Sequence, residues 1–315
     1  MSVRTDLALE AREMVQSQAQ ALDALSGVLA ETEHKASLTV TRVKVDEQGS
    51  RTLGKPQGEY ITVEAPNTLF SDLDLQESVT RCVAEELRHL LGERSGTALV
   101  VGLGNRDITA DALGPLTVER LLVTRHLKEA MPQLDSMASV CALSPGVLGL
   151  TGIETAEIVR GVVERVSPSF VLMIDALAAR RMERVNTTVQ LSDTGIRPGA
   201  GVGNHRLPLD EETLGVPVFS IGVPTVVDAA TIASDALESL CRHAPDSFAE
   251  FFGKMDEADR HAVLSEVLGG EEQNPFVTPK DMDSRVRRLS VILSEGLSLA
   301  LQPRLDLSEI RSLTT

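Results

Sequence analysis

The stretch that decides the fold is Thr97-Ala-Leu-Val-Val-Gly102, which continues through Leu-Gly104-Asn105 and a polar loop to Asp111-Ala-Leu-Gly114-Pro115. An unbroken apolar run that ends in glycine and polar residues is typical of a strand buried on both faces. The same pattern recurs in three later runs, at Met137–Leu143, Phe170–Ile174 and Pro217–Ile221. Segments with helical spacing follow the first, second and last of these runs, near residues 115–127, 153–166 and 228–241. The sequence therefore predicts an α/β fold, a three-layer α/β/α sandwich with a mostly parallel twisted central sheet.

Both flanks of this alternating region add further elements. Before it, the spacing predicts an N-terminal helix over residues 6–31 and another helix over 75–91, with a β-hairpin at 37–64 between them. After it, we expect a helical insertion at 242–275 and a last helix near 280–301. No internal repeat interrupts this order, so residues 1–315 are expected to form a single domain with the hairpin and the insertion as additions.

Composition excludes several classes of function. The chain has 315 residues, with 30 lysines and arginines against 46 acidic residues, and a formal charge of −16. Such a balance argues against direct nucleic-acid binding through phosphate neutralisation. The sequence holds no apolar run long enough for a membrane span and no signal peptide at its start. Three widely spaced cysteines without a CxxC pair favour free thiols, so an intracellular, cytoplasmic protein is expected.

Two aspartates lie at the carboxyl ends of predicted strands, where the active sites of parallel sheets are usually found. Asp111 lies in the loop after the first apolar strand, and Asp175 directly follows the run that ends at Ile174. Two carboxyl groups with separated pKa values can activate a water molecule and protonate a leaving amine. The alternatives are that Asp111 caps the helix beginning near Pro115 and that Asp175 only terminates its strand.

Other motifs carry less weight. Gly102-Leu-Gly104-Asn105 suggests a dinucleotide site, but Asp107 holds the place of the third glycine of that fingerprint. Asp193-Thr-Gly195 occurs once, whereas pepsin-like enzymes need two copies, so a glycine-rich substrate loop over 193–204 is the preferred interpretation. His205 with Asp111 and Asp175 has the donor types of a divalent metal site, and the alternative is a surface histidine. No GxSxG nucleophile motif is present.

Several long stretches together resemble the germination proteases of spore-forming bacteria, in order and spacing, across nearly the whole chain. They are Ser2–Ala8, Val100–Asn105, Asp111–Pro115, Ser144-Pro-Gly-Val, Ile174–Ala178, Asp193–Asn204, Ile221–Asp228 and Val277–Lys280. The resemblance implies a fold like that of the hydrogenase maturation endopeptidases and an atypical aspartic-type endopeptidase without a metal or other cofactor. By motif position, Asp111 and Asp175 match the two essential aspartates of the family.

The resemblance also implies a substrate and a setting. Small acid-soluble spore proteins are the expected substrate, degraded during germination in the spore core, by a protein made as a homotetrameric zymogen. Only Met1 precedes the Ser2-Val-Arg-Thr-Asp sequence before which the propeptide of such zymogens ends. Either this is the mature form with an added start codon, or this member is regulated differently.

Residues for substrate contact follow from the loops at the strand ends. They are Asn105, Asp193, Arg197, Gly201 and Asn204. Basic residues near the second aspartate are suited to hold acidic residues beside the scissile bond, or else form a solvated charged face. They are Arg180, Arg181, Arg184, Arg197 and Arg206. Two other functions stay open, a metal-dependent maturation-type endopeptidase using Asp111, Asp175 and His205, and a nucleotide-binding regulator without enzymatic activity.

Overall fold

One mixed sheet runs through the computed structural model, which describes residues 5–18, 26–130, 137–199, 206–243, 263–264, 266–268 and 275–314. Within these residues nine strands join it, and eight of them follow one another side by side. In spatial order they are β1 (Val28–Lys35), β2 (Leu38–Val45), β3 (Gly58–Glu64), β7 (Thr188–Ser192), β8 (Val218–Asp228), β6 (Phe170–Ala179), β4 (Thr97–Gly102) and β5 (Ser139–Leu143). The short β9 (Phe276–Val277) pairs with β8.

The α/β class is confirmed, but the prediction that the sheet is mostly parallel is wrong. Parallel pairing is confined to β5–β4, β4–β6 and β6–β8, while the five other pairings are antiparallel. The predicted hairpin forms, with β2 antiparallel to β3. Through β7, which the sequence did not reveal, it becomes an extension of the central sheet, because β7 pairs with β3 on one side and β8 on the other.

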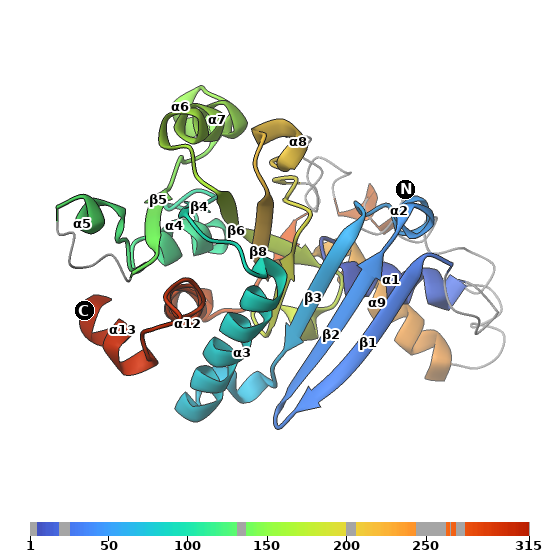
Figure 1. Ribbon diagram of the computed structural model, residues 1–315. Coiled ribbons are helices and arrows are strands. Elements are labelled where there is room, and N and C mark those ends of the chain that lie inside the picture. The colour runs from blue at the N-terminus through green and yellow to red at the C-terminus, as the bar shows by residue number, and fades with distance from the viewer. Residues whose placement is uncertain are drawn as a thin grey trace.

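Helices cover both faces of the parallel part, as a three-layer sandwich requires (Figure 1). On one face lie α3 (Leu73–Leu91), α4 (Leu113–Val118) and α12 (Met282–Leu301). On the other face lie α7 (Thr155–Val166) and α8 (Glu211–Leu214). Among the described residues, further α-helices are α1 (Ala8–Gln18), α2 (Glu47–Leu53), α5 (Arg125–Ala130), α6 (Leu148–Thr151), α9 (Ala229–His243) and α13 (Leu307–Thr314). None of the described helices combines the length and the hydropathy needed to cross a membrane.

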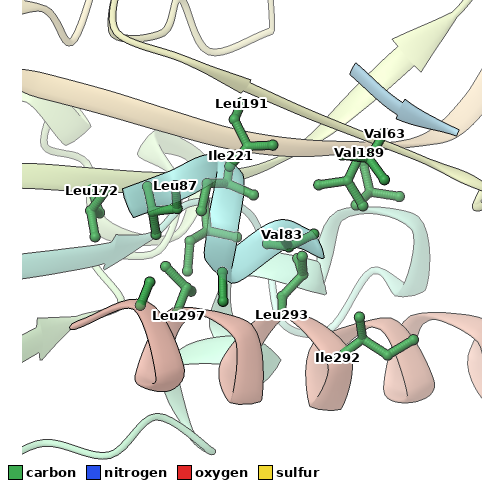
Figure 2. Packing of buried hydrophobic residues seen from close by; sticks show 14 of the residues in the cluster. Val63, Val83, Leu87, Leu172, Val189, Leu191, Ile221, Ile292, Leu293 and Leu297 are labelled. Carbon is green, nitrogen blue, oxygen red and sulfur yellow. The ribbon is translucent and has the colours of Figure 1, made fainter. Parts of the chain in front are cut away.

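The larger core lies between the sheet and the pair α3 and α12. Leu293 and Leu297 of α12 point toward the sheet, and Leu87 of α3 meets them there beside Ile221 of β8 (Figure 2). Helix α3 forms where apolar residues recur at helical spacing, and Asp72 caps its start by accepting a hydrogen bond from Leu75 N at 3.0 Å. Burying each leucine side chain contributes about 1.5–3 kcal/mol, so this layer stabilises the packing of α3 and α12 against the sheet.

Several predicted boundaries change. The described part of the N-terminal helix is Ala8–Gln18, and Val28–Lys35 forms β1 instead of continuing it. The helix expected over 115–127 is two helices, because Thr124 leaves the helical path and bonds β5 through Val140 N and Ala138 O. The insertion expected at 242–275 lies largely outside the described residues.

Strand β6 is longer than predicted, and this matters for the site. Its pairing with β4 ends at the Gly102–Ile174 pair, but β6 runs on to Ala179 with β8 as its continuing neighbour. Residues 175–179 therefore form an edge on the side where β4 has ended. Asp175 is the first residue of that edge and does not terminate the strand.

Candidate active site

The loop after β4 folds back onto β6 and brings Asp111 toward Asp175. Leu103 N donates to Ile174 O at 2.8 Å, which ties the loop to the residue before Asp175. Two glycines permit this close approach. A Cβ on Gly104 (φ 109°) would lie 2.0 Å from Asp111 O, and one on Gly114 would lie 2.7 Å from Ile174 O. A side chain at either position would push the loop away from the strand.

Asp111 is held by the backbone of its own loop. It ends the short turn η2 (Thr109–Asp111), and its Oδ2 accepts a hydrogen bond from Asn105 N at 2.6 Å. Ala112, not Asp111, occupies the cap position of α4, and no side chain caps that helix. The helix-capping alternative is therefore wrong. Asn105 contributes its backbone N–H to Asp111, while its side chain accepts from Asp107 N at 2.9 Å.

Asp175 is buried in the middle of the sheet, with 7% of its surface exposed. Burial raises the pKa of its carboxyl well above the usual value, and the negative charges of Asp111 and Asp6 raise it further. The pKa of Asp111 is also raised by burial, but the hydrogen bond from Asn105 N opposes that shift. The two carboxyl groups thus stand in different environments, and Asp175 is the one that more strongly retains its proton.

Two cavities meet at Asp175, with volumes of about 630 Å³ and 650 Å³. Asp6, Asp175, Leu177, Gly199 and Arg206 line both of them. The larger is also lined by Asp111 and the β4 loop, and the smaller by Lys55, Gln190 and Arg197. Because Asp175 stands where they join, the cavities form one cleft that extends to both sides of this carboxyl group. A cleft of this size accepts several residues of an extended polypeptide.

The residues predicted for substrate contact are only partly gathered here. Arg197 lines the smaller cavity, and Arg206 lines both cavities while its Nη1 lies 3.4 Å from Glu154 Oε1. Asp193 is not among the described residues lining either cavity. Its Oδ1 accepts from Glu59 N at 2.7 Å and so fastens the end of β7 to β3. Gly201, Asn204 and His205 lie outside the described residues.

The three arginines after β6 pair with acidic residues of the protein itself, and none of them is among the described residues that line either cavity, where a substrate contact would be expected. Arg184 is buried, and its guanidinium bonds Glu13 at 2.6 Å and 2.8 Å and Glu64 at 2.9 Å. Arg181 lies near Glu13 and Glu183, and Arg180 donates to Asp235. These contacts fix the N-terminal helix against the sheet, and they correct the interpretation of Arg184 as part of a solvated charged face.

The sequence did not single out Asp6, Lys55 or Gln190, which the fold adds to the cleft. Gln190 belongs to β7, which was not predicted because its polar side chains interrupt the apolar pattern of a buried strand. Lys55 lies in a turn after α2. Among the residues that the structure describes, no group of three or more histidine, cysteine, aspartate or glutamate side chains is arranged to hold a metal ion.

Comparison with known proteins identifies the family and confirms the resemblance. The family model described as germination protease matches residues 8–250. Germination protease from Caldanaerobacter subterraneus subsp. tengcongensis is 47% identical over 99% of this chain and 98% of its own length. The protein of that name from Clostridium tetani is 45% identical over 99% of both chains, and that from Bacillus cytotoxicus 39% identical over 97% of this chain and 95% of its own. With a match that runs nearly from end to end, this chain belongs to the germination protease family and is a protease.

Proposed function

We propose that this chain is an endopeptidase that degrades small acid-soluble spore proteins during germination, with Asp111 and Asp175 as its working carboxyl groups. The observation that carries the proposal is the meeting of the two aspartates in one cleft, in environments that separate their pKa values. The substrate, the spore core as the place of action and the homotetramer are proposed from the resemblance to germination proteases, and the name of the matched family supports action during germination.

The difference between the two environments supports a proposed role for each aspartate. Asp111, whose ionised form accepts a hydrogen bond from Asn105 N, is the general base. Asp175, more deeply buried and beside two other carboxylates, is the general acid. Water loses a proton to Asp111 as its oxygen bonds the scissile carbonyl carbon. The C–N bond of the resulting tetrahedral intermediate then breaks as Asp175 gives its proton to the leaving nitrogen. Exchange with solvent restores the starting protonation.

Charge in the cleft bears on the choice of substrate. Arg197 and Arg206 line it, and an arginine guanidinium is a strong partner for carboxylates. We expect them to hold acidic side chains near the scissile bond. Gly201 and Asn204 keep their proposed part in substrate contact, whereas Asn105 acts by holding Asp111 through its backbone N–H and Asp193 by anchoring its loop to β3.

The test is cleavage of a purified small acid-soluble spore protein, with fragments mapped by mass spectrometry. Asp111→Asn and Asp175→Asn should each lower kcat by about 10²–10⁴-fold, the range for removing a general acid or base. Asp107→Asn, in the same loop but exposed, should cleave at the wild-type rate. Full activity in either folded active-site variant would refute the assignment. Loss of wild-type activity in EDTA, restored by a divalent metal, would favour the maturation-type metal mechanism.

A further inference from the structure

A backbone carbonyl of the chain itself lies in the cleft, and two side chains hold it. Lys55 Nζ donates to Asp6 O at 3.0 Å and to Thr5 O at 3.1 Å. Gln190 Nε2 donates to the same Asp6 oxygen at 3.3 Å, and Gln190 Oε1 accepts from Ala8 N at 2.7 Å. One carbonyl oxygen therefore has an ammonium group and an amide N–H aimed at it from two different elements.

These donors lie across the cleft from the buried carboxyl group. Gln190 of β7 and Asp175 of β6 both pair in register with Gly222 of the intervening β8, so the three residues form one row of the sheet. Residues in one row point to the same face, and two strand spacings separate Gln190 from Asp175 by about 10 Å between Cα atoms. Gly222 has no side chain, and the side chain of Leu177 packs over it, with Cδ1 2.5 Å from where a Cβ of Gly222 would lie. Lys55, Gln190, Gly222 and Asp175 all line the smaller cavity.

The segment that carries this carbonyl runs through the cleft as a peptide would. Asp6 N donates to Ala178 O at 3.0 Å, and Ala178 N donates to Asp6 Oδ2 at 2.9 Å. The Asp6 carboxylate is near enough to raise the pKa of Asp175. Asp6 thus bonds Ala178 of β6 through its amide and carboxylate, while its carbonyl oxygen accepts from Lys55 and Gln190.

We propose that Lys55 and Gln190 form a carbonyl-binding pair, which holds the scissile carbonyl oxygen of a substrate at the position now taken by Asp6 O. The inference rests on the proposed function and deepens it. As water adds to the carbonyl carbon, the oxygen gains negative charge, which the ammonium and amide groups stabilise by hydrogen bonds without transferring a proton. Preorganised donors of this kind lower the barrier of acyl-transfer reactions.

Two opposing effects act on the ammonium form of Lys55. Burial lowers the pKa of Lys55, and the charges of Asp6 and Glu10 oppose that shift. A partly desolvated ammonium interacts with a developing negative charge more strongly than an exposed one does. Lys44, on β2 with 63% of its side chain exposed, and the exposed Gln57 offer matched controls for the two residues.

The test is steady-state cleavage of a small acid-soluble spore protein by full-length Lys55→Met and Gln190→Leu. Removing one such donor should lower kcat by about 10²–10³-fold, with KM changed much less, because the interaction strengthens only in the transition state. The loss in the double variant should be smaller than the product of the single losses, since both donors serve one oxygen. Lys55→Arg should recover part of the rate, and Lys44→Met and Gln57→Leu should match the wild type.

A merely structural role for Lys55 and Gln190 predicts different changes in kcat and KM. If the pair only anchors the N-terminal segment, its removal frees the cleft, and the variants will show an unchanged kcat or a lower KM. That result overturns the inference, and it leaves the two-aspartate function intact if Asp111→Asn and Asp175→Asn are inactive in the same assay. Wild-type protein that cleaves no spore protein overturns the proposed function and the inference together. Thermal unfolding of each variant confirms that rates are compared between folded proteins.

Discussion

Replacing Gly104 with alanine should disable the site without removing any of its functional groups. A Cβ at residue 104 would lie 2.0 Å from Asp111 O, whereas ordinary contacts begin at 3.4 Å, so the loop must open by 3.4 − 2.0 = 1.4 Å. A misplacement of about 1 Å in a catalytic group can cost about 10²-fold in rate. We therefore expect kcat to fall by about 10²-fold, although both aspartates remain.

The same substitution has a separate cost in stability. Gly104 has a φ of 109°, where an alanine is strained by about 1–3 kcal/mol, and the loss should be visible in urea unfolding. Gly161→Ala is the matched control. Gly161 lies inside α7 with no atom near its added Cβ, so alanine there should stabilise the helix by about 0.5–1 kcal/mol and leave kcat unchanged. A Gly104→Ala protein that keeps wild-type kcat would refute the view that this close approach positions Asp111.

Three further predictions concern stability. Because burial raises the folded-state pKa of Asp175, the folded protein binds the extra proton and loses stability as pH rises from the unfolded value of about 4 through the folded value. Asp175→Asn should then unfold at higher urea than wild type at pH 7, with the difference vanishing below about pH 4, and equal midpoints at neutral pH would contradict this. Arg184→Met leaves the carboxylates of Glu13 and Glu64 without their shared partner and should cost about 3–5 kcal/mol in urea unfolding, whereas a loss below 1 kcal/mol would show the cluster to be dispensable. Leu297→Ala, in the core layer of Figure 2, should cost about 2–5 kcal/mol by the same measurement, and a smaller loss would mean that the layer collapses around the gap.

The parts of the fold that sequence reasoning reached are those where local pattern and burial agree. The apolar runs of β4, β6 and β8 predicted the parallel core, and the polar residues after two of them predicted the aspartate pair in the cleft. The end of β6 was predicted too early, at Ile174 instead of Ala179, because Ala176-Leu-Ala178 carries no signal that separates a strand from a loop.

Strand β7 shows why the remaining parts of the sheet and of the cleft could not be predicted from the sequence. Its Thr188, Gln190 and Ser192 are buried although they are polar, and Gln190 and Ser192 line the cleft. A prediction from hydrophobic periodicity therefore assigns this segment to a loop. The role of Gln190 depends on register with Gly222 and Asp175, which lie far away in sequence. Lys55 likewise gains its place only when residues 5 and 6 fold over it.

The edge of β6 beyond the end of β4 has a consequence for what the cleft can accept. Edge strands invite pairing with any extended chain, and here the protein covers its own edge with residues near Asp6 and Glu10. A polypeptide that displaced this segment would bind to the edge through main-chain hydrogen bonds. The cleft would therefore select a substrate first by its extended conformation and only then by its side chains. Segments that are folded into helices or sheets would not bind, because their backbone groups are already hydrogen-bonded. An unfolded segment of the same sequence would bind, because its backbone groups are free to pair with the edge of β6.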